Sequence, residues 1–212
     1  MNAWTATRAG ELLALAAAAV LAGCGPTLSP EAQQILADGR QALERDDYDE
    51  AIAHIDRFLT DHGAAPATSR AEARLIRGTA RLGTGEPTAA RRDLNAAVGL
   101  GGTERVRGEA LTLLGDLAYD EGQTALAENL YREALEFLEA THPPAGRARL
   151  RLGVVLQRQG RWEDADAQFN RLIHDFPETM PAEAAGRRVH ATAWTVQAGA
   201  FRDRRRAEEL AK

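Results

Sequence analysis

The sequence predicts an all-α protein built from antiparallel helix pairs that stack one after another. Two observations carry this prediction. The 212 residues are rich in Ala and Leu, and only 5% of them are aromatic, a composition that favours helices packed closely through small side chains. One spacing also recurs four times, because a glycine is followed twelve residues later by an alanine. Such internal repetition indicates a solenoid in which each repeat covers an apolar face of its neighbour.

The recurring spacing marks the two helices of each pair. The glycine and alanine positions are Gly39/Ala51, Gly78/Ala90, Gly115/Ala127 and Gly153/Ala165. Four residues after each alanine stands a large apolar residue, namely Ile55, Leu94, Tyr131 and Phe169. We expect the small residues to let two helix backbones approach and the large residue to fill the space beside them. A turn separates the helices, and Pro87 stands where a second helix is expected to begin.

This pattern resembles the tetratricopeptide repeat, in four copies over residues 32–179. The segments DYDEAI (Asp47–Ile52) and RWEDADAQF (Arg161–Phe169) match the repeat best. The resemblance implies a right-handed solenoid of antiparallel helix pairs that binds other proteins. We therefore expect an interaction protein rather than an enzyme.

Two segments need a separate prediction. The second copy is the weakest match, because Arg74, Arg77 and Arg81 stand where the repeat has apolar residues. After the fourth copy, Pro181 can open a further helix that runs to about Ala191. We expect residues 180–192 to cap the apolar end of the solenoid and to link it to the C-terminal segment.

In the tetratricopeptide family, the first helix of each pair lines a groove that takes extended peptides or partner helices. The positions that match the groove here are Arg40, Asp116, Tyr119, Arg147, Arg151 and Gln157. The resemblance makes these residues candidate contacts for a partner protein. An ordinary solvated helix face explains each of them individually as well.

The sequence contains no pattern of catalytic or metal-ligating residues. Its five histidines form no HExxH pair. The acidic run Asp46–Glu50 lacks the glycine and the distal glutamate of an EF-hand loop, and it is better explained as the acidic first turn of a helix. A net charge of −5 argues against nucleic acid as a partner. We expect no enzymatic activity, no metal and no cofactor apart from a covalent lipid.

The N-terminus predicts that lipid. An apolar run of eleven residues, Leu12–Ala22, follows Arg8. It is too short for a membrane span of ~20 residues but suits the core of a signal peptide. The tetrad Leu21, Ala22, Gly23 and Cys24, which includes the one cysteine of the chain, resembles a bacterial lipobox. The alternative is an uncleaved helix with an incidental cysteine.

The lipobox resemblance implies cleavage after residue 23 and lipidation of Cys24, with residues 24–31 forming the lipidated cysteine and a linker. Two acyl chains suffice for a stable anchor. Gly25 follows the cysteine in place of the aspartate that favours inner-membrane retention. We therefore expect the periplasmic face of the outer membrane as the location.

The C-terminus, residues 193–212, has a different pattern. In WTVQAGAFRDRRRAEELAK, polar and apolar residues alternate as in a strand before a charged helical segment begins. Val196, Gln197, Gly199 and Phe201 resemble the VQxGxF strand that opens a SPOR domain, a peptidoglycan-binding module. The resemblance implies an incomplete α/β start of that domain, with Gln197 as a candidate contact for glycan strands stripped of their stem peptides. The alternative is a terminal helix that packs on the last repeat.

Together these features predict a cell-envelope lipoprotein scaffold. The lipid anchors the protein to a membrane, the repeats bind envelope proteins that the sequence does not identify, and a complete SPOR domain would bind peptidoglycan during cell division or wall remodelling. The alternative is an outer-membrane assembly or pilus and secretion lipoprotein that acts through its repeats without binding glycan.

Overall fold

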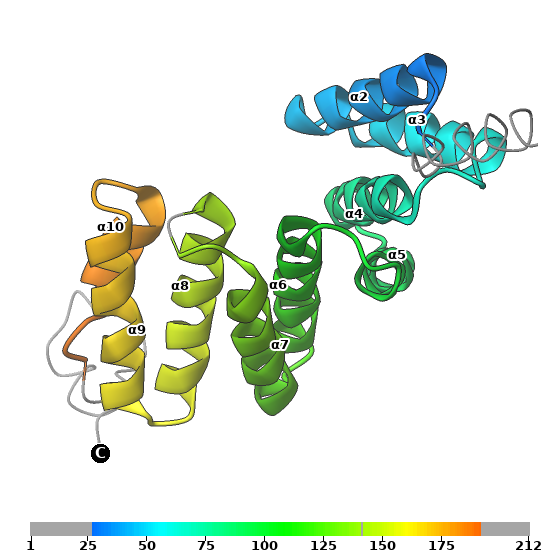
Figure 1. Cartoon of the computed structure of the whole chain (residues 1–212). Helices are drawn as coiled ribbons and strands as arrows, with labels where there is room; N and C mark the ends of the chain where they lie inside the picture. Colours follow the sequence, from blue (N-terminus) through cyan, green and yellow to red (C-terminus); the bar gives the residue numbers. More distant parts are fainter. Residues whose placement is uncertain (1–26, 141, 192–212) are drawn as a thin grey trace, which may run out of the picture. The chain divides into compact units, whose positions relative to one another are not determined.

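The computed structural model describes residues 27–140 and 142–191, and all regular secondary structure in these ranges is helical. The described helices follow one another from α2 to α10 (Figure 1). The chain divides into two compact units, Met1–Glu139 and Ala140–Lys212, and each is described by itself. The predicted all-α class and the pairing of the helices are confirmed for the described residues. The predicted lipid anchor at Cys24 and the predicted start of a SPOR domain lie outside these residues.

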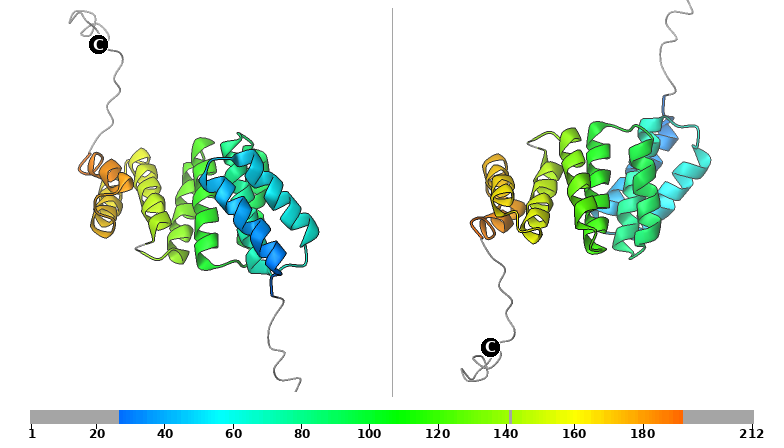
Figure 2. Two further views of the ribbon diagram at one scale, coloured as in Figure 1. Left: turned by 90° about the horizontal axis from the view of Figure 1, so that it is seen from above. Right: turned by 90° about the horizontal axis from the view of Figure 1, so that it is seen from below.

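Unit 1, Met1–Glu139, contains three antiparallel helix pairs (Figure 2). The helices are α2 (Pro30–Glu44), α3 (Tyr48–Asp61), α4 (Ala67–Gly83), α5 (Pro87–Gly99), α6 (Glu104–Asp120) and α7 (Thr124–Phe137). Consecutive pairs contact each other through α3 with α4 and α5 with α6, and the first helices of neighbouring pairs, α2, α4 and α6, contact one another as well. Each pair thus covers an apolar face of the next, as expected for a solenoid. The predicted start of a second helix at Pro87 is confirmed.

The recurring glycine is where the two helices of a pair touch. A Cβ atom on Gly39 would lie 2.6 Å from Ile55 Cδ1, and one on Gly115 would lie 2.6 Å from Tyr131 Cε1. Gly78 faces Leu94 and Gly153 faces Phe169 in the same way. All four large residues are fully buried. The predicted role of the glycine and of the large residue is confirmed in every copy.

The turn within each pair depends on a residue with positive φ, seven positions after the recurring glycine. Gly85, Gly122 and Gly160 occupy this position with φ between 75° and 79°. The first pair uses Asp46 instead, with φ of 60°, a conformation that aspartate tolerates better than most residues. The Tyr48 hydroxyl donates a hydrogen bond to Asp46 Oδ1 at 2.9 Å, which holds the turn together.

The three unexpected arginines of the second pair surround one buried carboxylate. Asp93 on α5 is 1% exposed. Its Oδ1 accepts hydrogen bonds from Arg74 Nη1 and Arg77 Nη2, both at 2.7 Å. Its Oδ2 accepts from Arg77 Nε at 2.8 Å and Arg81 Nη1 at 2.6 Å. Arg77 also pairs with Asp56 on α3, so the cluster joins the first two helix pairs.

This cluster explains why the second copy departs from the repeat pattern. Burial by itself would raise the pKa of Asp93, but the hydrogen bonds from Arg77 and Arg74 and the charges of Arg77 and Arg81 outweigh burial and leave this pKa below its ordinary value. The arginines therefore replace apolar contacts with a satisfied ionic cluster. The second pair is complete rather than poorly formed.

Unit 2 contains α8 (Pro143–Arg158), α9 (Trp162–Asp175) and α10 (Met180–Gly186). The short α10 packs against α9 and α8 and buries Ala182 and Ala185. At its start, Thr179 Oγ1 accepts a hydrogen bond from the Ala182 N–H at 3.3 Å. The predicted run to about Ala191 is too long. The helix ends at Gly186, a residue type of low helix propensity, and His190 has φ of 66°.

Candidate functional site

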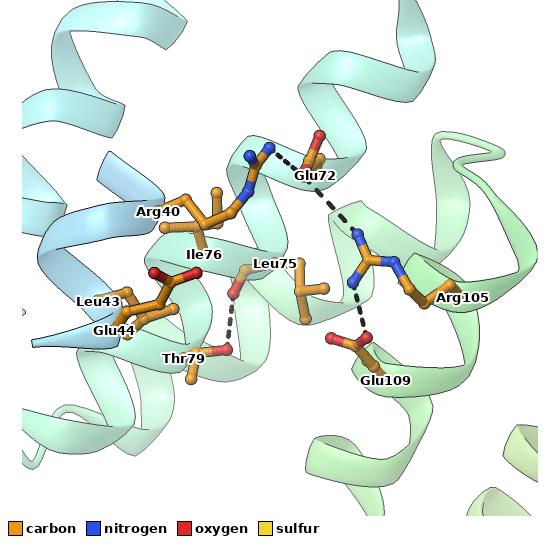
Figure 3. A pocket seen from close by; sticks show the side chains of 9 residues that line it. All are labelled: Arg40, Leu43, Glu44, Glu72, Leu75, Ile76, Thr79, Arg105 and Glu109. Atoms are coloured by element: carbon orange, nitrogen blue, oxygen red, sulfur yellow. Dashed lines mark hydrogen bonds and ion pairs between the residues drawn. The ribbon is translucent and has the colours of Figure 1, made fainter. Parts of the chain in front are cut away.

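The first helices of the three pairs in unit 1 line a groove of about 620 Å³. Its side chains project from α2, α4 and α6 (Figure 3): Arg40, Leu43, Glu44, Glu72, Leu75, Ile76, Thr79, Arg105 and Glu109. The volume lies within the range of ligand-binding pockets. Because the three helices are the first helices of successive pairs in one stack, the groove is a direct product of the repeat architecture.

Charged side chains form a chain of ion pairs across the groove. Glu72 Oε1 accepts a hydrogen bond from Arg40 Nη2 at 2.6 Å and lies 3.7 Å from Arg105 Nη2 (Figure 3). Arg105 Nη1 donates in turn to Glu109 Oε1 at 2.7 Å. These partly exposed pairs add little to stability. They do hold donors and acceptors at fixed positions along the groove.

The floor of the groove is apolar and its charge balance is negative. Leu75 and Ile76 form the floor and are almost fully buried, and Leu43 is half-buried beside them. Three glutamates and two arginines line the groove, which gives a net charge of −1. The exposed carboxylate of Glu44 takes part in no hydrogen bond or ion pair within the described residues. An apolar floor with one uncompensated carboxylate suits a ligand that is both apolar and cationic.

Of the three predicted groove residues in unit 1, one lines the groove and two do not. Arg40 lines the groove, and its role as a contact for a partner stays a prediction. Asp116 is partly buried, and its Oδ1 accepts a hydrogen bond from the Tyr131 hydroxyl at 2.7 Å, so it fixes the second helix of its own pair. Tyr119 is half-buried on α6. Neither Asp116 nor Tyr119 is among the residues that line the groove.

The remaining predicted groove residues lie in unit 2. Arg147 is exposed on α8 and Arg151 is half-buried on the same helix. Gln157 is 1% exposed, and its Nε2 donates a hydrogen bond to the Arg188 carbonyl at 2.9 Å. Gln157 therefore holds the segment after α10 in place instead of offering its amide to a ligand. The partner-binding role of Arg147 and Arg151 stays a prediction.

Several predicted sites lie outside the described residues. They are the lipidation site Cys24, the lipobox residues Leu21, Ala22 and Gly23, and the glycan-contact candidate Gln197. None of the helices in the described ranges combines the length and apolar character that a membrane crossing requires. Within residues 27–140 and 142–191, no group of three or more His, Cys, Asp or Glu side chains is placed to hold a metal ion.

Sequence reasoning missed most of the groove, although one signal was present. Glu72 and Glu109 each stand six residues before the recurring glycine of their pair. The same offset in the fourth copy gives Arg147, which was predicted. Comparing the copies in this register would have identified Glu72 and Glu109. Arg105 has no such signal, because it reaches the groove from the first turn of α6.

Comparison with known proteins decides the family. Two sequence profiles, both described as tetratricopeptide repeat, match residues 36–105 and 107–173, which together make up more than half of the chain. The chain belongs to the tetratricopeptide-repeat family. The predicted repeats are thereby confirmed. Proteins of this family are in general scaffolds for protein–protein interaction, and the fold indicates that role here.

Solved structures with the same fold include other tetratricopeptide-repeat proteins. A crystal structure of MamA has a TM-score of 0.55 and 22% identity, and the match covers 68% of this chain and 77% of MamA. Pseudomonas aeruginosa pilF has a TM-score of 0.59 and 16% identity, over 73% of this chain and 67% of pilF. YrrB, described as a TPR protein with an unusual peptide-binding site, has a TM-score of 0.53 and 19% identity, over 71% of this chain and 74% of YrrB. At these identities the likeness shows the fold alone. No curated protein matches the sequence significantly.

Proposed function

We propose that this tetratricopeptide-repeat protein is a cell-envelope scaffold that binds a segment of a partner protein in the groove of α2, α4 and α6. The observation that carries the proposal is the groove itself, which combines an apolar floor with fixed charged groups from three successive repeats. Such a surface suits an amphipathic helix or an extended peptide. The description of the YrrB site as peptide-binding supports a peptide as the class of ligand.

The charges of the groove define the partner segment further. Arg40, Glu72, Arg105 and Glu109 are already engaged with one another. Glu44 remains without an ionic partner within the described residues. A segment that places an apolar side chain over Leu75 and a Lys or Arg beside Glu44 would satisfy both features. We therefore expect apolar segments with a flanking basic residue to bind, and acidic ones to be disfavoured.

Selection of peptides against the purified full chain tests this role. Random peptides are displayed and selected, and the affinity of the enriched sequences is measured by fluorescence anisotropy. The expected result is enrichment of apolar peptides with a flanking Lys or Arg. Glu44→Lys should shift the preference toward acidic flanking residues by about fivefold, because a charged contact at an exposed site is worth up to about 1 kcal/mol.

The matched control is Glu136→Lys. Glu136 is an exposed glutamate of α7 without an ionic partner in the described part of the chain, and it does not line the groove. This variant should keep the wild-type preference. Equal effects of the two substitutions, or no enrichment of any peptide, would contradict a peptide-binding groove.

The envelope location rests on the N-terminal sequence. The apolar run before Cys24 and the lipobox-like tetrad support a lipid anchor on this cysteine, with the outer membrane as the destination. In a bacterial host, labelling with a palmitate analogue should mark the wild-type protein and should be lost in Cys24→Ser. Unchanged labelling of the variant would contradict the anchor.

The wall-binding part of the proposal rests on the likeness of residues 193–212 to the start of a SPOR domain. A form of the protein that carries the whole domain should sediment with peptidoglycan from which the stem peptides have been removed, and Gln197→Ala should weaken this binding. Division or wall remodelling would then be the process served. If such a form stays in solution, an assembly or pilus and secretion role through the repeats alone becomes the better explanation.

A further inference from the structure

A second pocket, of about 420 Å³, lies in unit 1 and shares no residue with the groove. The end of α3, the start of α4 and the end of α5 meet there. Its lining consists of Leu59, Gly63, Arg70, Arg74, Ala96, Gly99 and Leu100. Among these lining residues are two guanidinium groups and no carboxylate. The pocket is thus cationic with largely apolar walls.

The arginines of this pocket belong to a stripe along α4. Arginine recurs at helical spacing, at positions 70, 74, 77 and 81. Since successive residues of an α-helix are turned by about 100°, these four side chains share one face. Glu72, Ile76 and Thr79, which line the groove, lie on the opposite face of α4. A ligand of the second pocket would therefore bind independently of a partner in the groove.

The stripe carries more positive charge than the described carboxylates neutralise. Arg74, Arg77 and Arg81 all bond to Asp93, and Arg77 also pairs with Asp56. The side chain of Arg70 takes part in no hydrogen bond or ion pair within the described residues, while its backbone N–H donates to the Pro66 carbonyl. Its Nε is nonetheless buried without a hydrogen-bond partner. A buried donor without an acceptor is costly, and because Nε is enclosed by the protein, the terminal amino groups of Arg70 are the donors that a ligand can reach.

The ends of α3 and α5 explain why Arg70 is tolerated there without a carboxylate. The carbonyl ends of helices carry partial negative charge and favour nearby cations. They accept no hydrogen bond from Arg70, however, because the described structure contains none for this side chain. The terminal amino groups of Arg70 thus remain available to a ligand.

The residues that line the pocket indicate which functional groups a ligand should carry. A guanidinium group matches the two oxygens of a carboxylate or a phosphate. Leu59, Ala96 and Leu100 form apolar walls around Arg70, and apolar walls favour a ligand that carries hydrocarbon. Only one guanidinium group of the pocket lacks an ionic partner among the described residues, so it can balance a single negative charge. A carboxylate carries that charge, whereas a phosphate dianion carries two. The charge balance therefore favours a carboxylate.

We propose that this pocket binds a carboxylate carried on a short aliphatic group, with Arg70 as the residue that binds the carboxylate. Two sources present this chemistry: a free short-chain fatty acid, and the C-terminal carboxylate of a peptide that ends in leucine. The site is separate from the groove, so its occupation does not depend on the proposed partner segment.

Binding is measured by NMR titration of the ¹⁵N-labelled full chain. The probes are hexanoate and N-acetyl-glycyl-leucine, each compared with its neutral amide. Both carboxylates should shift the NMR signals of the backbone N–H groups of Gly63 and Gly99, which line the pocket. The two neutral amide analogues should not shift these signals. The carboxylate that binds with the lower Kd indicates whether the pocket takes a fatty acid or the C-terminus of a peptide. Arg70→Gln should weaken binding of that carboxylate about tenfold or more, as expected for the loss of a charge-assisted hydrogen bond.

Arg92→Gln is the matched control. Arg92 is an exposed arginine of α5, has no partner in the described residues and does not line the pocket. It should bind the carboxylates as the wild type does, and so should Glu44→Lys in the groove. Circular dichroism verifies that Arg70→Gln keeps its fold. Three results would overturn the proposal: equal shifts with the neutral amides, the same shifts with inorganic phosphate alone, or an equal loss in Arg92→Gln.

Discussion

Asp93 is the residue that links the first two repeats most directly. Its buried carboxylate accepts hydrogen bonds from three arginines of α4, and one of these also reaches Asp56 of α3. Three helices thus meet through one carboxylate. Removing one partner of a buried ionic cluster is far more harmful than removing a surface pair, because it leaves the remaining charges buried without compensation.

Asp93→Asn should therefore destabilise the protein by about 3 kcal/mol, as expected for breaking a buried ion pair. Urea unfolding followed by circular dichroism measures this change. Asp61→Asn is the control, because Asp61 is 52% exposed and pairs with Arg57 only at the surface, where such pairs contribute about 0–1 kcal/mol. Similar losses in the two variants would contradict the structural role of Asp93.

The same cluster predicts a pH dependence. Because the pKa of Asp93 is lower in the folded chain than its ordinary value, the stability that it contributes is fully present above the unfolded value of about 4 and is lost as the pH falls through the lowered pKa. The difference in unfolding free energy between the wild type and Asp93→Asn should accordingly narrow on acidification below about pH 4. A difference that stays constant down to the acid limit of folding would contradict this assignment.

At the residue scale, sequence reasoning recognised the three arginines as departures from the repeat but not their purpose. Arg74, Arg77 and Arg81 share one face of α4. Their common partner, Asp93, lies on the next helix among the buried residues Ala90, Leu94 and Ala97, at a position where an amphipathic pattern ordinarily has an apolar residue. Only the packing of α5 against α4 shows that these groups meet. The sequence shows the three arginines and the aspartate, but it does not show that they lie close enough to form ion pairs.

At the element scale, each helix pair depends on the contact between a glycine and a large apolar side chain. In unit 2, a Cβ on Gly153 would lie 2.7 Å from Phe169 Cζ. Phe169 is fully buried, and side chains in close-packed protein interiors have little space to move into. This contact was predictable, because the glycine and the large residue recur at a fixed spacing in four copies. The length of α10 was not, because a seven-residue helix leaves too short a periodic pattern.

Gly153→Ala should destabilise unit 2 by about 1–2 kcal/mol, because overpacking at the Phe169 ring outweighs the gain in helix propensity from glycine to alanine. Thermal unfolding monitored by circular dichroism measures the effect. Gly186→Ala in the same unit is the control, since a Cβ there has no neighbour within 4 Å, and its midpoint should stay close to that of the wild type. A midpoint of Gly153→Ala at or above the wild-type value would contradict the tight contact.

At the scale of the whole molecule, the repeats place two different surfaces on opposite faces of α4. The groove has an apolar floor, charged walls and a net negative charge, and the second pocket is cationic. The family resemblance predicted a groove along the first helices, and its candidate Arg40 lines the pocket found there, while the partner-binding role of Arg40 stays a prediction. The resemblance could not identify Arg105 or the role of Gln157, since both depend on how particular helices pack. A scaffold with two independent surfaces can bind two ligands at once.

The proposed function requires that a partner segment bind to the face formed by α2, α4 and α6. Photo-crosslinking tests it most directly. A selected peptide with a photoreactive side chain at its apolar anchor is irradiated with the purified full chain, and the attachment points are mapped by mass spectrometry. Attachment is expected at groove residues such as Leu43, Thr79 and Glu109, and the unlabelled peptide should compete with it. Attachment confined to α3, α5 and α7, or to unit 2, would contradict it.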